Sequence, residues 1–167
     1  MKQVEVSQAM KEGMRRLASG VCVVTATDIN GDPCAMTATS VTSLSDSPSS
    51  LLVCVNQDTR LYEAMQQQGS MFCINLLGSS HEEISNRCAF GDPGKARFEV
   101  GDWNFSSPAA YLESALACFF CSRDQLIDYG THGILIGQID KVLINEADEG
   151  EAVIDPLIYL NGGYYSL

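Results

Sequence analysis

Positive charge is scarce in this chain. Only ten of its 167 residues are Lys or Arg, against 21 Asp and Glu, and the formal net charge is −11. A protein that binds a nucleic-acid backbone needs a basic surface. The charge balance therefore argues against a DNA- or RNA-binding role, while the 46% hydrophobic content predicts a packed core.

Long apolar runs are missing as well. No stretch approaches the roughly 20 apolar residues that a spanning helix needs, and residues 1–6 contain no apolar core of a secretory signal. We therefore expect a cytoplasmic protein. The seven cysteines are an odd number and occur singly in apolar runs, as at Cys22, Cys54 and Cys73. This pattern predicts reduced, buried thiols rather than a disulfide framework.

The common nucleotide and hydrolase motifs are also absent. The chain has no GxGxxG, no P-loop and no GxSxG. Cys118 and Cys121 have CxxC spacing, but on a strand they would point to opposite faces. Because no second ligand pair is spaced for zinc, we expect no metal site.

The patterns that are present predict one domain over residues 1–167, mainly β with short helices. Apolar, β-branched runs predict about seven strands, and Asn30-Gly31 is a strong hairpin signal between the first two. Capping patterns predict three short helices. The expected strands are 21–27, 33–44, 51–55, 71–77, 111–127, 133–144 and 157–160, and the expected helices begin near Ser7, Arg60 and Ser79. The hairpins favour a closed β-barrel, and the lack of regular βαβ alternation argues against a doubly wound sheet.

The segment 37–50 is unusually rich in hydroxyl groups. Alternation along a strand would place Thr37 and Thr39 on one face and Ser40 and Thr42 on the other. Hydroxyls on both faces suit a bound phosphate or a polar ring edge, although an edge strand that uses the β propensity of threonine explains them equally well.

A helix start follows the next strand, at Asn56-Gln57-Asp58-Thr59-Arg60. Free N–H groups there could bind an anion and Arg60 could pair with a phosphate, but an ordinary capped helix has the same pattern. Asn75 could bond the polar edge of a ligand or a neighbouring strand. His132 lies between glycines at a strand start and is a candidate site residue, whereas His81 is expected to be solvated.

Several of these stretches, taken in order, resemble the short-chain flavin reductases, the reductase components of two-component flavin monooxygenases. The resemblance is carried by residues 14–21, 36–40, 54–56 and 74–77, and then by 97–98, 112–117 and 132–137. It covers nearly the whole chain, and the succession of the pieces is more specific than any one of them.

The resemblance implies an FMN-binding split β-barrel and a homodimer with sites near the subunit interface. It implies NADH or NADPH as hydride donor, FMN or FAD as acceptor, and release of reduced flavin to a separate oxygenase. His132 would stand near the nicotinamide. The residues that would line the flavin are Thr37, Ala38, Thr39, Ser40, Cys54, Val55, Asn56, Thr59, Arg60, Asn75, Leu76 and Leu77, with Lys95 or Arg97 on the phosphate side. Gln57 and Asp58 depart from the family pattern, which predicts weaker phosphate retention.

Two alternatives remain at this point. One is a flavin- or haem-binding split-barrel protein without turnover, and the other is an enzyme on a related barrel that resembles pyridoxamine-phosphate oxidase. The reductase interpretation requires no catalytic acid–base pair, because the cofactor carries the chemistry and the protein supplies orientation.

Overall fold

A computed structural model describes residues 5–90, 94–145 and 154–167 of the chain. The helices are α1 (Val6–Met14), α2 (Arg60–Ala64) and α3 (Glu82–Ala89), with 3-10 turns η1 (Ser79–His81) and η2 (Lys95–Phe98). The strands are β1 (Ser19–Gly20), β2 (Cys22–Thr27), β3 (Pro33–Ala38), β4 (Thr42–Asp46), β5 (Ser49–Asn56), β6 (Met71–Leu76), β7 (Trp103–Asn104), β8 (Tyr111–Leu112), β9 (Ala117–Tyr129), β10 (His132–Ile144), β11 (Ile158–Leu160) and β12 (Gly163–Tyr165).

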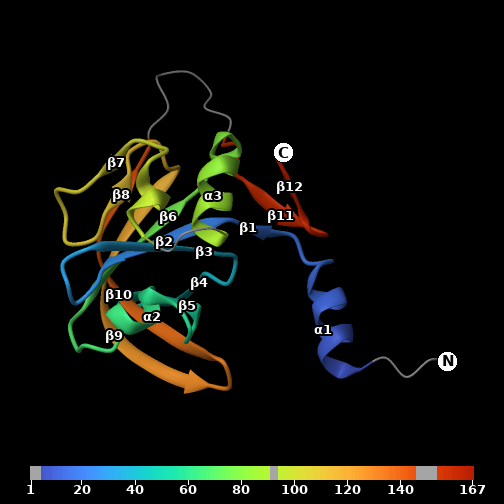
Figure 1. The fold of residues 1–167 in the computed structure, drawn as a ribbon, viewed down its shortest axis with the longest axis horizontal. Coiled ribbons are helices and arrows are strands. Elements are labelled where there is room, and N and C mark those ends of the chain that lie inside the picture. The colour runs from blue at the N-terminus through green and yellow to red at the C-terminus, as the bar shows by residue number, and fades with distance from the viewer. Residues whose placement is uncertain (1–4, 91–93, 146–153) are drawn as a thin grey trace.

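Seven antiparallel strands form the main sheet, in the order β3-β2-β6-β9-β10-β5-β4. The sheet curls until side chains from its distant strands meet, so that Val24 of β2 and Val53 of β5 share one buried cluster (Figure 1). Leu61 and Met65, in and just after α2, pack into the same cluster and are almost fully buried. This closed arrangement confirms the predicted mainly β barrel.

A second buried cluster lies on the outer face of the barrel. It joins strand residues such as Val23 and Cys73 to Ile84 of α3 and to Leu112 in the connection before β9. Cys118 belongs to this outer cluster and Cys121 to the inner one. The two thiols therefore face opposite sides of β9, as strand alternation predicts. None of the seven cysteines forms a disulfide; six are buried and Cys54 is half-buried.

The predicted strand 33–44 is in fact two strands. β3 ends at Ala38 and the chain crosses to the other edge of the sheet, where β4 begins at Thr42. The predicted hairpin between β2 and β3 is confirmed, with Gly31 at φ 81°. Helix α2 begins at Arg60, as predicted, and ends at Ala64, whose carbonyl accepts from the Ser70 hydroxyl at 2.9 Å.

The C-terminal strand was not predicted. Asn161 (φ 51°) and Gly162 (φ 84°) turn the chain back on itself, and β12 pairs with β11. This small hairpin extends sheet pairing to β1 and lies next to the barrel (Figure 1). Among the described residues, no helix combines the length and apolar character needed to cross a membrane.

His81 was expected to be solvated, and that prediction is wrong. Only 8% of the residue is exposed, and its Nδ1 accepts a hydrogen bond from the Gly78 amide at 3.0 Å. The proton then lies on Nε2, which is 3.1 Å from the Ser114 hydroxyl, and Ser114 donates to Asp102. His81 thus joins the start of α3 to the loop before β9.

Stability should depend on pH through His81. Burial lowers the pKa of this imidazole from its ordinary 6.5, against the opposing charge of Asp102. Because the unfolded chain binds the proton more readily, the free energy of unfolding should be highest above about pH 6.5 and should fall as pH decreases below it. Urea unfolding at about pH 7.5 and about pH 5.5 measures this loss. His81→Asn can accept from Gly78 but does not titrate, so its loss should be smaller, and an equal loss would contradict the assignment.

Candidate active site

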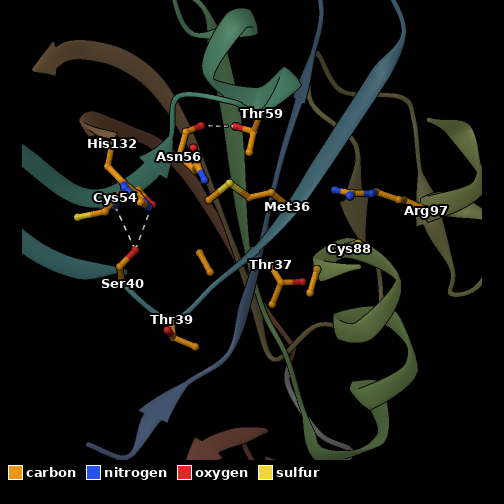
Figure 2. Close-up of a pocket in the computed structure, with 12 residues that line it drawn as sticks. Met36, Thr37, Thr39, Ser40, Cys54, Asn56, Thr59, Cys88, Arg97 and His132 are labelled. Atoms are coloured by element: carbon orange, nitrogen blue, oxygen red, sulfur yellow. Dashed lines mark hydrogen bonds between the residues drawn. The ribbon is translucent and has the colours of Figure 1, made fainter. Parts of the chain in front are cut away.

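A pocket of about 440 Å³ opens where β3 faces β5 across the barrel (Figure 2). This volume lies within the usual range for small-molecule sites. The lining residues come from β3 and the turn after it, from β5 and the start of α2, and from α3, η2 and the start of β10. They are Met36, Thr37, Ala38, Thr39, Ser40, Cys54, Asn56, Thr59, Cys88, Ala89, Arg97 and His132.

One serine bridges the seam of the barrel beside this pocket. The first half of β5 pairs with β4, but the ladder between them extends only to Leu52. Beyond that point the Ser40 hydroxyl accepts from the Cys54 amide at 3.1 Å and lies 3.3 Å from the Cys54 carbonyl. A side chain therefore takes the place of a neighbouring strand, and the two sides of the pocket are held together below its opening.

The corner between β5 and α2 is fixed by short polar contacts. The side-chain oxygen of Asn56 accepts from the Asp58 amide at 2.9 Å. The Thr59 hydroxyl donates to the Asn56 carbonyl and accepts from the Tyr62 amide, which makes Thr59 the N-cap of α2. This capping confirms the predicted helix start and holds Asn56 and Thr59 against the pocket.

His132 reaches the pocket from the adjacent strand. It pairs with Asn56 in the ladder between β10 and β5, and its carbonyl accepts from the Gln57 side chain at 3.1 Å. The imidazole is exposed, with Nδ1 2.9 Å from the Thr131 hydroxyl. A side chain in this position can meet a ligand that enters from solvent.

Helix α3 forms the opposite wall. The Thr37 hydroxyl donates to the Ser85 carbonyl at 2.6 Å, which ties β3 to this helix. Cys88 lines the pocket from one turn further on, and burial raises the pKa of its thiol to about 11. Since a thiol in that state stays protonated near neutral pH, Cys88 is a wall residue and not a nucleophile.

Arg97 is the one permanently charged residue in the described lining of the pocket. It lies on η2, and its Nη1 donates to the carbonyl of Ala35 on β3. The described lining contains no carboxylate, although the whole chain carries an excess of acidic groups. An arginine in a pocket wall can bind an anionic ligand through charge-assisted hydrogen bonds.

Comparison with known families places this pocket in context. The family model "Flavin reductase like domain" matches residues 14–167, which is most of the chain. The chain belongs to the flavin reductase family.

Two curated relatives illustrate the family. "FMN reductase (NADH) RutF" of Agrobacterium fabrum is 36% identical over 155 residues, which are 92% of this chain and 84% of the relative. "Probable flavin reductase" of Rhizobium meliloti is 36% identical over 160 residues, which are 95% of this chain. The chain spans about half the length of that second relative, at 48%.

Solved structures show the same fold. A "putative flavin reductase" of Haemophilus somnus is 32% identical with a TM-score of 0.85, and the match covers 98% of this chain and 100% of the other. BorF, the flavin reductase component of a bacterial two-component tryptophan halogenase, is 27% identical with a TM-score of 0.82, covering 96% and 98%. The family and fold expected from the sequence are both confirmed.

The predicted site residues of this flavin reductase family member divide into two groups. The structure brings together in one pocket the residues Thr37, Ala38, Thr39, Ser40, Cys54, Asn56, Thr59, Arg97 and His132. It leaves outside that pocket Val55, Arg60, Asn75, Leu76, Leu77 and Lys95.

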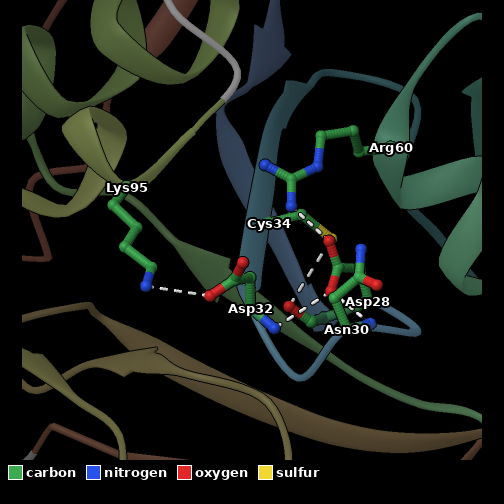
Figure 3. Close-up of polar contacts among 7 residues, drawn as sticks. Asp28, Asn30, Asp32, Cys34, Arg60 and Lys95 are labelled. Atoms are coloured by element: carbon green, nitrogen blue, oxygen red, sulfur yellow. Dashed lines mark hydrogen bonds and ion pairs between the residues drawn. The ribbon is translucent and has the colours of Figure 1, made fainter.

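Arg60 and Lys95 are held by acids of the β2–β3 turn (Figure 3). Arg60 forms an ion pair with Asp28, which lowers the pKa of that carboxyl and raises the pKa of the guanidinium. Asp28 also accepts from the amides of Asn30 and Asp32, each at 2.9 Å. Lys95 lies 2.9 Å from Asp32. Both cations are thus directed to the turn.

Asn75 is part of the core in this structure. It is fully buried, its amide donates to the Val23 carbonyl at 3.0 Å, and its oxygen accepts from the Leu112 amide at 2.8 Å. The same oxygen accepts from the Cys118 thiol. Of the two alternatives for this amide, the structure shows bonding to neighbouring strands.

The other residues outside the pocket are apolar. Val55 points into the barrel and Leu77 into the outer cluster, because strand alternation directs them there. Leu76 lines a separate groove beside α1. Three pocket residues were not predicted, namely Met36, Cys88 and Ala89. Met36 directly precedes the hydroxyl-rich segment, but nothing in the sequence places the end of α3 opposite it.

Proposed function

We propose that this chain is an NADH-dependent flavin reductase that takes FMN, or FAD, as the hydride acceptor. The observation that carries the proposal is the pocket between β3 and β5, called the flavin pocket below. Its described lining combines hydroxyl and amide groups with a single permanent positive charge and contains no carboxylate. The names of its relatives agree with this activity.

The pocket residues fit a flavin nucleotide. The cleft between β3 and β5 would hold the ring, with Thr37 and Thr39 on the side of β3, Asn56 on the side of β5, and the bonded pair of Ser40 and Cys54 beside it. Arg97 would bind the phosphate. A bound flavin supplies the ability to accept a hydride, and the protein supplies the placement.

The protein need only orient the two rings, because direct hydride transfer requires no acid–base pair. We assign His132 to the nicotinamide side, where its exposed imidazole could hydrogen-bond the carboxamide. Thr131 and Gln57 fix the position of this residue through its ring nitrogen and its carbonyl.

The proposal includes a partner. Reduced flavin would pass to a separate oxygenase component, as the description of the related BorF suggests for its own halogenase. Weak phosphate retention would suit that transfer, and it is supported by the engagement of Arg60 and Lys95 with Asp28 and Asp32. Each of these cations already has an acidic partner outside the pocket.

We also propose a homodimer in the cytoplasm. Large apolar side chains remain exposed on the single chain, among them Ile127, Tyr129 and Ile144 on the β9–β10 hairpin. A second copy could cover such groups. Free thiols at all seven cysteines suit a reducing compartment.

The test is oxidation of NADH by the purified protein with and without added FMN or FAD. We expect turnover only when flavin is present, and a higher KM for NADH in His132→Ala. A protein that carries tightly held flavin or haem and gives no rate above free flavin would support the non-catalytic alternative and overturn the proposal.

A further inference from the structure

A second cavity of about 790 Å³ begins where the flavin pocket ends. It is a groove between α1 and the turn from β3 to β4, and it shares Thr39 and Ser40 with the flavin pocket. Tyr159 of β11 forms part of the opposite wall. A ligand longer than the flavin pocket could therefore continue into this groove.

Two cations line the groove, Lys11 and Arg15. No ion pair joins either of them to a carboxylate in the part of the chain that the structure describes. The described lining of the groove also contains no acidic residue. In a chain with only ten basic residues, two of them thus line one groove whose described lining is free of acidic residues. Such a surface attracts and binds phosphate groups.

Arg15 is held in place by the C-terminal hairpin. Its carbonyl accepts from the Asn161 amide at 2.7 Å. Its guanidinium lies over Gly162, since a Cβ at that glycine would be 3.8 Å from Cζ of Arg15. Arg15 and Tyr159 both line the groove, and the Tyr159 ring packs edge-on against Tyr164 at 5.5 Å between centroids. Apolar side chains of Met10 and Met14 complete a wall that can contact a flat base.

We propose that this groove binds the adenylate half of the dinucleotide whose reactive end enters the flavin pocket, with Arg15 and Lys11 contacting the phosphate on the adenosine side. The inference rests on the proposed reductase function and adds a subsite to it. Arg97 and the Thr39–Ser40 end lie on different sides of the flavin pocket (Figure 2). If Arg97 holds the flavin phosphate, the groove at Thr39 and Ser40 is left for the nicotinamide dinucleotide, and we assign it to NADH.

Kinetics with a truncated hydride donor test the assignment. Reduced nicotinamide mononucleotide lacks the adenylate half, so it cannot use the groove. In Arg15→Gln we expect the KM for NADH to rise by roughly tenfold, the effect of losing charge-assisted hydrogen bonds. The KM for the mononucleotide should stay within about twofold, because it never made those contacts. Lys11→Gln should show the same pattern more weakly, since lysine binds as a point charge.

Arg16→Gln is the matched control. Arg16 is the neighbouring arginine and does not line the groove. Its substitution removes the same charge as Arg15→Gln. Its KM values for both donors should match the wild type. An equal rise for NADH and the mononucleotide in Arg15→Gln, or a change in the oligomeric state of that variant, would overturn the proposal by showing a structural or interface role.

The flavin arm of the experiment separates the two dinucleotides. With the mononucleotide as donor, the KM for FAD and for FMN should both be unchanged in Arg15→Gln. A selective rise for FAD would assign the groove to the flavin adenylate and overturn its assignment to NADH. Wild-type turnover with FMN and the mononucleotide tests the reductase function itself, without any use of the groove. If the wild type showed no such turnover, the proposed reductase function would be wrong, whatever the role of the groove.

Discussion

Arg97→Gln is expected to raise the KM for FMN by roughly ten- to a hundredfold, the loss that follows from removing a charged hydrogen-bond donor worth about 1.5–3 kcal/mol. Arg97 is the one permanent charge in the described lining of the flavin pocket. A flavin phosphate would otherwise meet only neutral groups there. Steady-state reduction of FMN, with NADH in excess, measures the change.

Riboflavin provides the internal control, because it has the ring but no phosphate. Its KM should change little in Arg97→Gln. Lys95→Gln is the matched variant: Lys95 lies two positions away on the same turn, pairs with Asp32, and does not line the pocket. It should leave the KM for FMN near the wild-type value. Parallel losses for FMN and riboflavin would instead show that Arg97 acts by holding Ala35 and β3.

Asn75→Ala is expected to lower the free energy of unfolding by about 2–4 kcal/mol, because it removes the side chain that satisfies a buried backbone amide. The Leu112 amide would lose its acceptor and the Val23 carbonyl its side-chain donor, and both residues lie in the core. Urea unfolding followed by circular dichroism measures the loss. The KM for FMN of the folded protein should be unchanged, since Asn75 does not line the pocket.

Asn56→Ala is the matched variant for Asn75→Ala, because it removes the same side chain from the pocket wall instead of from the core. Asn56 is half-buried, and its side-chain oxygen accepts from the amide of Asp58. This variant should raise the KM for FMN and cost stability by only about 1 kcal/mol. If Asn75→Ala instead raised the KM for FMN and left the free energy of unfolding unchanged, the assignment of Asn75 to the core would be wrong.

The sequence predicted the mainly β fold because its strands, turns and helix starts depend on local patterns. Alternating strands, the Asn30-Gly31 turn and the Thr59 cap each follow from a few neighbouring residues. The hydroxyls of 37–40 were recognised as unusual, yet from the residues alone an edge strand explained them as well. The ordered resemblance to a family identified them as a pocket.

The predicted site residues that lie outside the pocket depend on contacts between distant parts of the chain. Asp28 pairs with Arg60 across 32 positions, and Asp32 with Lys95 across more, so a scan for phosphate-binding cations could not show that both were engaged. Asn75 bonds Leu112 at a distance of 37 positions. His81 was misjudged for the same reason, since the Ser114 that covers it comes from another loop.

The Ser40–Cys54 bridge has a consequence for the coupling between ligand and fold. At that point the barrel is closed by a single side chain, with the pocket occupying the rest of the gap between β3 and β5. A ring bound there would contact both β3 and β5, and these contacts would stabilise the barrel where no backbone ladder joins the two strands. Ligand affinity and barrel integrity are then linked by mass action, so that the loaded protein melts at a higher temperature that rises with ligand concentration. Release of the ligand would remove this added stabilisation.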